Sequence, residues 1–158
     1  DIIPKTWTQV TEGISYIASD GTKLTASSYY SSALTADKAC DGSAEEYWGS
    51  SNDAQPSWIK LEFVTPVLIT KMKILYLSTN QYISSCKIQC SNDGSEWIDL
   101  YNLPEHPSND GVYEEAKLNN PTVSKYYRIY SEKKSSTSSP TFRDWQVSEW
   151  QEYGLLGK

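Results

Sequence analysis

The strongest constraint on the fold lies in residues 58–77, where two apolar runs follow each other with almost no break. In the first run, WIKLEF at 58–63, every second residue is apolar, which is the period of a half-buried β-strand. The second run, VLITKMKILYL at 67–77, is the longest apolar segment of the chain and predicts a central strand. Helical periodicity is weak everywhere else, so the chain is predicted to be all-β.

Short apolar or alternating runs separated by turn residues make up the remainder of the chain. SCKIQC at 85–90 leads through the turn SNDG at 91–94 into SEWIDLY at 95–101. This order predicts a β-hairpin with Asp-Gly at its tip. Further strands are expected at 112–118, 125–131 and 144–153, and one short helical turn within 27–39. Such a series of short strands is typical of a β-sandwich or barrel.

The chain length indicates a single domain. The 158 residues are enough for one hydrophobic core. We expect one domain over residues 1–158 with ragged ends, and a mobile Ser-rich loop at 132–141. No apolar run approaches the length of a transmembrane helix. The N-terminus has no signal-peptide pattern, although the chain could be part of a larger secreted protein.

Charge and aromatic composition narrow the classes of ligand. The net charge is −6 and no basic run occurs, which argues against nucleic-acid binding and against binding to anionic membranes. Twelve Tyr and six Trp stand against two Phe. Tyr and Trp combine an apolar ring with a polar tip, so they suit half-buried surfaces and binding faces. We expect about half of them to fill the core.

Few residues are suited to catalysis or to tight metal binding. The cysteines are Cys40, Cys86 and Cys90, an odd count that gives no disulfide framework. Cys86 and Cys90 fall on one face of a strand with Ile88 between them, and we interpret them as buried small side chains. His106 is the only histidine, so a zinc site is disfavoured and a catalytic triad has no support. The sequence therefore predicts no enzyme.

Six motifs in order resemble the discoidin, or coagulation factor 5/8 type C, domain family. Its family 32 carbohydrate-binding modules are the nearest branch, and type C modules of phage tails and adhesins are also similar. The resemblance covers roughly residues 24–154 and implies a jelly-roll-like β-sandwich of about eight strands. The motifs are LTASSYYSS (24–32), ADKACDGSAEEYWGSS (36–51), PSWIKLEFVTPVLITKMKILY (56–76), CKIQCSNDGSEWIDLY (86–101), SKYYRIYS (124–131) and VSEWQEYG (147–154).

The resemblance implies a structural Ca²⁺ held between the DG loop and the last strand. By position, Asp41 and Glu149 would supply side-chain oxygens, and Lys38, Ser43 and Glu46 would supply main-chain carbonyls. A hard cation that needs six to eight oxygen ligands suits such a turn. Glu46 departs from the family, which usually has Thr there. The residues alone favour another interpretation, in which Asp41 caps the turn and Glu149 is a solvated strand residue, and only the resemblance favours a metal.

The resemblance also implies a sugar site formed by loops at the same end of the sandwich. The corresponding candidates are Tyr47, Asn52, Asn80, Tyr82, Arg143 and Trp145. Trp48 matches a residue packed beneath the site, and Trp58 and Trp97 are expected to be structural. Gly49 stands where galactose-binding members often have His, so a preference for galactose is not supported.

The resulting hypothesis is a non-catalytic carbohydrate-binding module that recognises cell-surface or polysaccharide glycans. It would belong to a larger multidomain protein, outside the cell or on a cell or virion surface. The alternative is a structural or protein-interaction type C domain without a sugar site, as in a phage tail or adhesin. The missing His after Trp48 favours that alternative. Lipid binding is disfavoured by the Ser-rich loops and the net charge of −6, and the fold alone decides none of these functions.

Overall fold

The computed structural model describes residues 6–29, 31–40, 48–49, 56–76, 86–103, 114–131 and 146–156, with the backbone alone for 75–76, 114 and 146–156. Within these ranges the chain forms ten antiparallel strands and one short 3₁₀ helix. Their bounds are β1 Trp7–Thr11, β2 Ser15–Ala18, β3 Lys23–Ala26, η1 Ala36–Cys40, β4 Trp48–Gly49, β5 Ser57–Tyr76, β6 Cys86–Ser91, β7 Ile98–Asn102, β8 Glu114–Lys117, β9 Ser124–Ser131 and β10 Gln146–Leu156.

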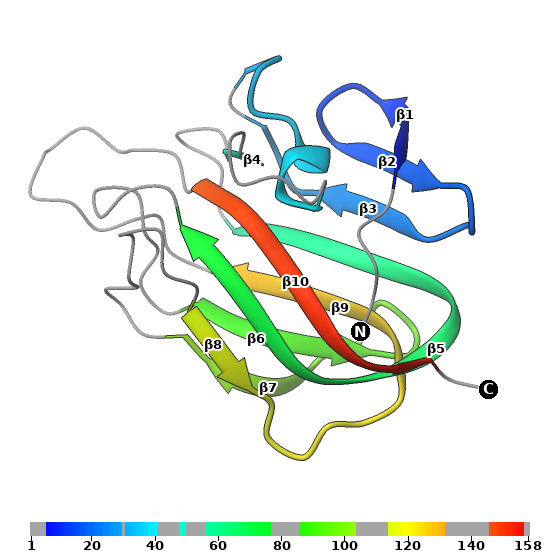
Figure 1. The fold of residues 1–158 in the computed structure, drawn as a ribbon, viewed down its shortest axis with the longest axis vertical. Helices are drawn as coiled ribbons and strands as arrows, with labels where there is room; N and C mark the ends of the chain where they lie inside the picture. The colour runs from blue at the N-terminus through cyan, green and yellow to red at the C-terminus, as the bar shows by residue number, and fades with distance from the viewer. Residues whose placement is uncertain are drawn as a thin grey trace, which may run out of the picture.

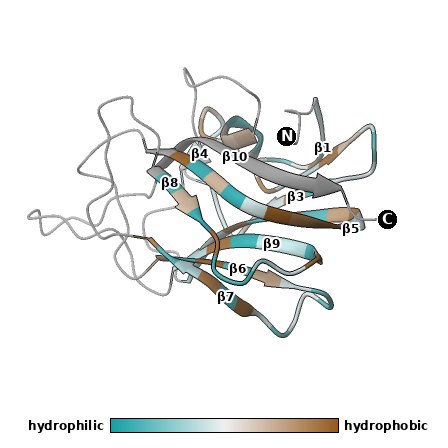
Figure 2. Cartoon of the chain, turned by 60° about the horizontal axis from the view of Figure 1, so that its bottom comes forward, coloured by the Kyte–Doolittle hydropathy of each residue, from teal (hydrophilic) through white to brown (hydrophobic). Residues whose placement is uncertain are grey.

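The strands form the two layers of a β-sandwich (Figures 1 and 2). The first layer has the order β1-β2-β3-β5-β9-β6-β7, and the second is made by β8, the later part of β5, β10 and β4. The prediction of an all-β sandwich is confirmed. The structure has ten strands where about eight were expected, because β1 and β2 extend the first layer.

One long strand, β5, belongs to both layers. Residues 57–62 pair with β9, and residues 67–76 pair with β10. Between these parts Val64, Thr65 and Pro66 are exposed, and the register with β9 is interrupted. Proline has no N–H to donate, so this unpaired crossing is a position where it costs no ladder hydrogen bond. The two strands expected at 58–63 and 67–77 are therefore one bent strand.

A bulge adjusts which side chains of β5 face the core. Val67 and Ile69 are buried, but the next buried residues are Met72 and Ile74, which changes the alternation by one position. The register with β10 shifts at the same place, between Lys71 and Ile69. An extra residue in one strand reverses the faces that follow it. The bulge thus keeps apolar side chains buried on both sides of Thr70. Apolar and polar residues alternate along much of β5 (Figure 2).

Tyr127 on β9 ties the first layer to the later part of β5. Its ring is fully buried, and its hydroxyl oxygen lies 2.7 Å from the Val67 carbonyl and 2.9 Å from the Thr122 carbonyl. The same oxygen accepts the Ile69 N–H at 3.3 Å. Burial raises the pKa of the Tyr127 hydroxyl, because the charged form would lose its hydration. This residue therefore combines apolar packing with a polar link between the layers.

Cys86 and Cys90 are buried, which confirms their interpretation as small core residues, and Cys40 is buried as well. Cys86 and Cys90 face the core on β6 with Ile88 between them. Burial raises the pKa of both thiols. Among the residues that the model describes, no helix is long and apolar enough to cross a membrane.

Candidate functional site

Several strands of the first layer start or stop at one end of the sandwich. Ser131, the last residue of β9, is the register partner of Ser57 at the start of β5 and of Cys86 at the start of β6. The segments 50–55, 77–85 and 132–145 therefore connect to this end. The bend of β5, at the right of Figure 1, lies at the opposite end of the sandwich.

The second layer contributes to the same end, which is called the loop end below. Val147 near the start of β10 is the register partner of both Trp48 in β4 and Tyr76 at the end of β5. Serines 27 and 28 link the layers there, because Trp58 N donates to Ser27 Oγ at 2.9 Å and Trp48 Nε1 donates to the Ser28 carbonyl at 2.9 Å. The segment 41–47, which runs into Trp48, is thus anchored at this end as well.

Trp48 forms part of the core beneath the loop end. Its side chain is fully buried, and its indole N–H has found a carbonyl partner, as a buried Trp requires. Gly49 N donates to the Leu34 carbonyl at 3.2 Å, which fixes β4 against the preceding loop. The expectation that Trp48 is packed below the site is confirmed. Trp48 provides a rigid base and is not itself available to a ligand.

The predicted ligand residues lie outside the described residues. Each of them belongs to one of the segments anchored at the loop end, namely 41–47, 50–55, 77–85 and 132–145. The backbone therefore brings the anchors of these segments together, while the side-chain positions remain predictions. These residues are Tyr47, Asn52, Asn80, Tyr82, Arg143 and Trp145.

The predicted calcium ligands are divided between two elements that pack together. Lys38 belongs to η1, and η1 contacts β10. Glu149 lies on β10, where its backbone is in register with Leu75. The Cys40 carbonyl, directly before the DG motif, accepts the Trp7 indole N–H at 2.8 Å. The remaining candidates, Asp41, Ser43 and Glu46, lie outside the described residues.

No metal cluster is formed by the side chains that the model describes: within these ranges, no three His, Cys, Asp or Glu residues gather. The calcium site therefore stays a prediction. The described backbone is compatible with it, because the segment that leads into Asp41 and the strand that bears Glu149 are neighbours. Main-chain and carboxylate oxygens are also the ligand set that Ca²⁺ prefers.

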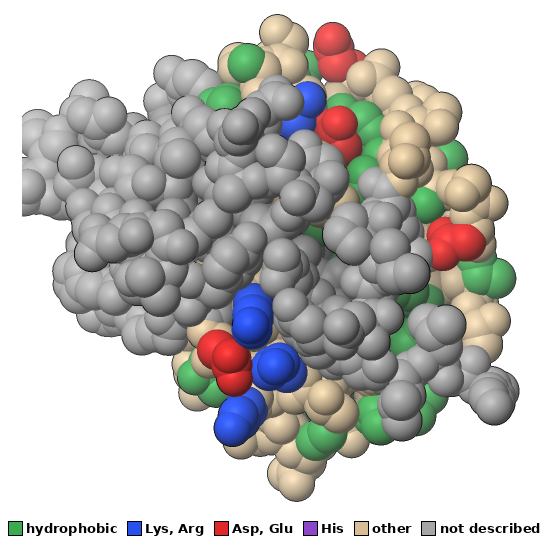
Figure 3. All heavy atoms as spheres, in the orientation of Figure 1, with side chains coloured by type: hydrophobic (Ala, Val, Ile, Leu, Met, Phe, Trp, Pro, Cys, Tyr) green, Lys and Arg blue, Asp and Glu red, His purple; other side chains and the backbone are tan. Residues whose placement is uncertain are grey.

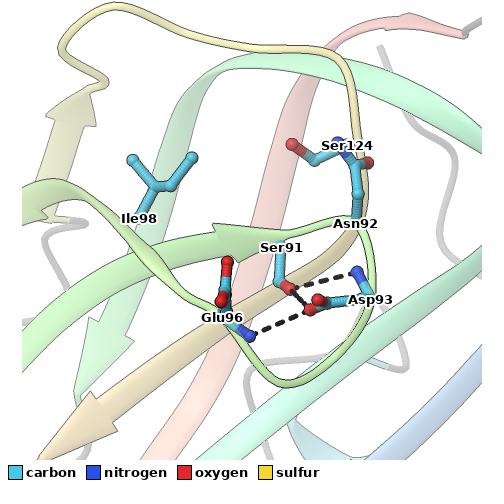
Figure 4. A pocket seen from close by; sticks show the side chains of 6 residues that line it. All are labelled: Ser91, Asn92, Asp93, Glu96, Ile98 and Ser124. Carbon is cyan, nitrogen blue, oxygen red and sulfur yellow. Dashed lines mark hydrogen bonds between the residues drawn. The ribbon is translucent and has the colours of Figure 1, made fainter.

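A shallow hollow of about 290 Å³ lies at the β6–β7 turn, at the opposite end of β6 from Cys86 (Figure 4). Asp93 lines it, but its Oδ1 accepts the backbone N–H groups of Ser95 at 2.8 Å and Glu96 at 2.9 Å. These bonds, chiefly that from Glu96, hold the pKa of Asp93 below its usual value. The full lining is Ser91, Asn92, Asp93, Glu96, Ile98 and Ser124.

The hollow is consequently a product of turn formation. Gly94 has a φ of 77°, a left-handed conformation that glycine adopts without a steric penalty. Ser91 Oγ accepts the Gly94 N–H at 2.9 Å, which closes the turn. The predicted hairpin with Asp-Gly at its tip is confirmed. Asp93 is engaged in building the turn, so its carboxylate is not free for a ligand.

Sequence reasoning missed the importance of the outer face of the first layer. Trp58 and Trp97, both expected to be structural, are half-buried there and contact cations. Lys60 Nζ lies 5.0 Å from the centre of the Trp58 ring, and Arg128 Cζ lies 3.9 Å from that of Trp97. The alternation in KYYRIYS at 125–131 indicated that Arg128 shares a face with two tyrosines. The contact with Trp97 depends on the β6–β7 turn, which that pattern does not reveal.

Comparisons with known proteins agree with this architecture. The model of the F5/8 type C domain family matches residues 23–144. A comparison with curated proteins found no match. Chitosan-binding module 1 from a chitosanase/glucanase of Paenibacillus sp. IK-5 is 25% identical, with a TM-score of 0.65 over 83% of this chain and 93% of that one.

Two structures from Clostridium perfringens have the same fold. The module CpGH89CBM32-5, in complex with GalNAc-β-1,3-galactose, is 18% identical, with a TM-score of 0.67 over 84% of this chain and 95% of that one. The family 89 glycoside hydrolase CpGH89, in complex with GlcNAc-α-1,4-galactose, is 22% identical with a TM-score of 0.67. The match covers 87% of this chain and 14% of the hydrolase, so the likeness is to one part of a much longer chain.

Proposed function

Because the chain belongs to the F5/8 type C domain family, we propose that it is a non-catalytic carbohydrate-binding module that recognises cell-surface or polysaccharide glycans at the loop end. The observation that carries this proposal is that the described residues flanking four connecting segments meet at that end, together with the buried Trp48. The likeness to a chitosan-binding module over 83% of the chain supports it.

The candidate side chains suit the chemistry of sugar recognition. A pyranose ring offers an apolar C–H face to aromatic rings and hydroxyl groups to a few polar side chains. Tyr47, Tyr82 and Trp145 would supply the rings. Asn52 and Asn80 would supply amide donors and acceptors, and Arg143 a cationic donor. Because Trp48 is fixed below them, the segments that bear these residues would be held on a rigid base.

A structural Ca²⁺ is part of the same proposal. Asp41 and Glu149 would contribute carboxylates, and Lys38, Ser43 and Glu46 would contribute carbonyls. The contact between η1 and β10 supports this assignment, because it brings the backbone of the two ligand segments together. The ion would stabilise the connection between the DG loop and the last strand.

Calcium dependence can be measured by thermal unfolding of the chelated protein with and without added Ca²⁺. We expect the melting temperature to rise, since an ion at about 100 times its dissociation constant stabilises the folded state by about 2.7 kcal/mol. Asp41→Asn should abolish the rise, whereas Asp99→Asn on β7 should preserve it. Equal melting temperatures with and without millimolar Ca²⁺ would count against the ion.

We further propose that the module acts outside the cell within a larger multidomain protein, as the likeness to one part of CpGH89 supports. Its role there would be to bring the protein to a glycan surface. A module of this kind gains avidity when several copies are linked, even if a single copy binds weakly.

A glycan array that includes chitotriose and GalNAc-β-1,3-galactose tests the function. Binding to at least one glycan is expected, and Tyr82→Ala should weaken it at least tenfold without lowering the melting temperature. Val123→Ala is the matched control, because Val123 is exposed immediately before β9, at the end opposite to Ser131. Binding to no glycan on the array would overturn the proposal and favour a structural or protein-interaction domain.

A further inference from the structure

A cluster of aromatic and cationic side chains lies on the outer face of the first layer, on β5, β9 and the β6–β7 turn. We call it the sheet-face cluster. Cross-strand register creates it: Lys60 is opposite Arg128, and Trp58 is opposite Tyr130. The residues that alternate with the cluster members along β5 and β9, such as Ile59 and Ile129, point into the core. The members of the sheet-face cluster are Trp58, Lys60, Trp97, Tyr126, Arg128 and Tyr130.

The guanidinium of Arg128 is held in place by rings and by an amide. Its Cζ lies 3.9 Å from the centre of the Trp97 ring and 4.1 Å from that of Tyr130. Its Nε donates to Gln89 Oε1 at 2.8 Å, and Gln89 Nε2 donates to Asp99 Oδ1 at 2.7 Å. These contacts use the faces and the Nε edge of the guanidinium. Among the described residues, its terminal nitrogens make no hydrogen bond.

Lys60 places a second positive charge directly across from Arg128. Its Nζ lies 5.0 Å from the centre of the Trp58 ring and 5.9 Å from that of Tyr126. Like charges on opposite strands repel each other, and both groups are half-buried. Desolvation by burial lowers the pKa of Lys60 and of Arg128, which indicates that each charge is less well solvated than usual.

The nearby carboxylates, Glu62 and Asp99, attract Lys60 and Arg128 electrostatically but form their ion pairs with other cations. Glu62 lies 3.9 Å from Lys125 Nζ, and Asp99 lies 3.1 Å from Lys87 Nζ. Within the described part of the chain, neither Lys60 nor Arg128 forms an ion pair. The cluster therefore has two cations that repel each other and a guanidinium whose terminal nitrogens make no hydrogen bond among the described residues. Both features favour the binding of an external anion.

We propose that the sheet-face cluster is a second binding site, which takes a carboxylate-bearing sugar such as a uronic acid unit of a polysaccharide. The terminal nitrogens of Arg128 would bind the two carboxylate oxygens side by side, which is the strongest geometry for that pair. Lys60 would supply the second charge. The edges of the surrounding rings would contact the sugar ring.

The choice of a sugar over an acidic peptide rests on the proposed function, whereas the choice of a carboxylate rests on the cluster alone. The site is also separate from the loop end, because Lys60 and Arg128 lie on strand faces and outside the connecting segments. The two sites can therefore be tested independently.

Affinity electrophoresis in gels with hyaluronate, or with carboxyl-reduced hyaluronate, tests the proposal. We expect hyaluronate to retard the protein and the reduced polymer to have no such effect. Arg128→Gln and Lys60→Gln should each weaken the retardation at least fivefold. Lys60→Gln serves as the safer variant for folding, since Lys60 makes no hydrogen bond within the described residues, and circular dichroism should show both variants folded.

The matched control is Lys73→Gln, which removes the same charge from the other layer. Lys73 lies opposite Glu115 on β5 and β8, where basic side chains gather beside an acidic one (Figure 3). Retardation of this variant should equal that of the unmodified chain. The proposal is overturned if Lys73→Gln and Lys60→Gln have equal effects, if reduced hyaluronate retards the protein equally, or if polyglutamate binds with the same dependence on Arg128.

The outcome also separates this site from the loop end. Arg128→Gln should leave the response on the neutral glycans of the array unchanged, and Tyr82→Ala should leave the retardation by hyaluronate unchanged. If the protein binds no neutral glycan but still binds hyaluronate, the proposed glycan site at the loop end is contradicted and the proposed site at the sheet-face cluster is not. If hyaluronate does not retard the protein, the proposed carboxylate site at the sheet-face cluster is contradicted and the proposed site at the loop end is not.

Discussion

The two faces of β9 use similar residues for different purposes. Tyr127 and Ile129 point inward, where they are fully buried and the Tyr127 hydroxyl is bonded to β5. Tyr126, Arg128 and Tyr130 point outward, where the tyrosine rings contact cations. The comparison shows that the alternation of one strand separates the groups that stabilise the sandwich from groups that can meet a ligand.

The largest expected difference between the faces concerns apolar burial. Ile129→Ala should lower the free energy of unfolding by about 2–5 kcal/mol, because it leaves a cavity between the layers. Tyr130→Ala, one position along, should cost much less, since its ring is half-exposed. Urea denaturation measures both values. Equal losses for the two variants would remove the distinction between the faces.

A smaller difference should follow from removing single hydroxyl groups. Tyr127→Phe leaves buried polar groups of Val67 and Ile69 without this partner, so the free energy of unfolding should fall by about 1–3 kcal/mol. Tyr130→Phe is the matched control on the outer face, and we expect a change below about 0.5 kcal/mol. The same denaturation experiment compares them, and an unaffected Tyr127→Phe variant would show that the link between layers is unimportant.

The smallest effect concerns the pH dependence that the buried thiols produce. Burial raises the pKa of Cys86, so the thiol stays protonated in the folded chain while it ionises near pH 8.5 in the unfolded chain. The contribution of this thiol to the free energy of unfolding is therefore fully present below about pH 8.5 and is lost as the pH rises above that value.

Between pH 8 and pH 9.5, this single thiol should cost the protein about 1 kcal/mol of stability. Cys86→Ser lacks the titrating group, so its free energy of unfolding should decline less over the same interval. Parallel urea denaturation series at the two pH values provide the comparison. A decline of the same size in both proteins would mean that the Cys86 thiol is accessible in the folded state.

The layered fold could be predicted because its central strands have clear patterns. WIKLEF and KYYRIYS alternate. The predicted segment at 85–90 differs from β6 by one residue at each end, and that at 125–131 differs from β9 by one residue at its start. The first strands were not predicted, because WTQVT at 7–11 and SYIA at 15–18 are too short to show a clear period. The continuity of β5 was hidden by Pro66, which is a strand breaker in most contexts.

The candidate sites were less accessible to sequence reasoning, for a physical reason. Cross-strand partners such as Lys60 and Arg128 are far apart in sequence, so only the register reveals that two cations are opposite each other. At the loop end, the sequence could identify residue types in the connecting segments. The backbone places the described residues that flank these segments at one end of the sandwich, and the roles of Tyr82 and Arg143 remain predictions.

The most direct test of the central claim is an amide chemical-shift titration of the labelled protein with chitotriose and with GalNAc-β-1,3-galactose. If the loop end binds glycans, at least one of the two should shift the amides of Gly49, Tyr76 and Val147, which mark that end. The amides of Thr8 and Gly94, in β1 and in the hairpin turn, should stay unchanged. Shifts that appear only away from the loop end, or no shifts with either sugar, would contradict the account.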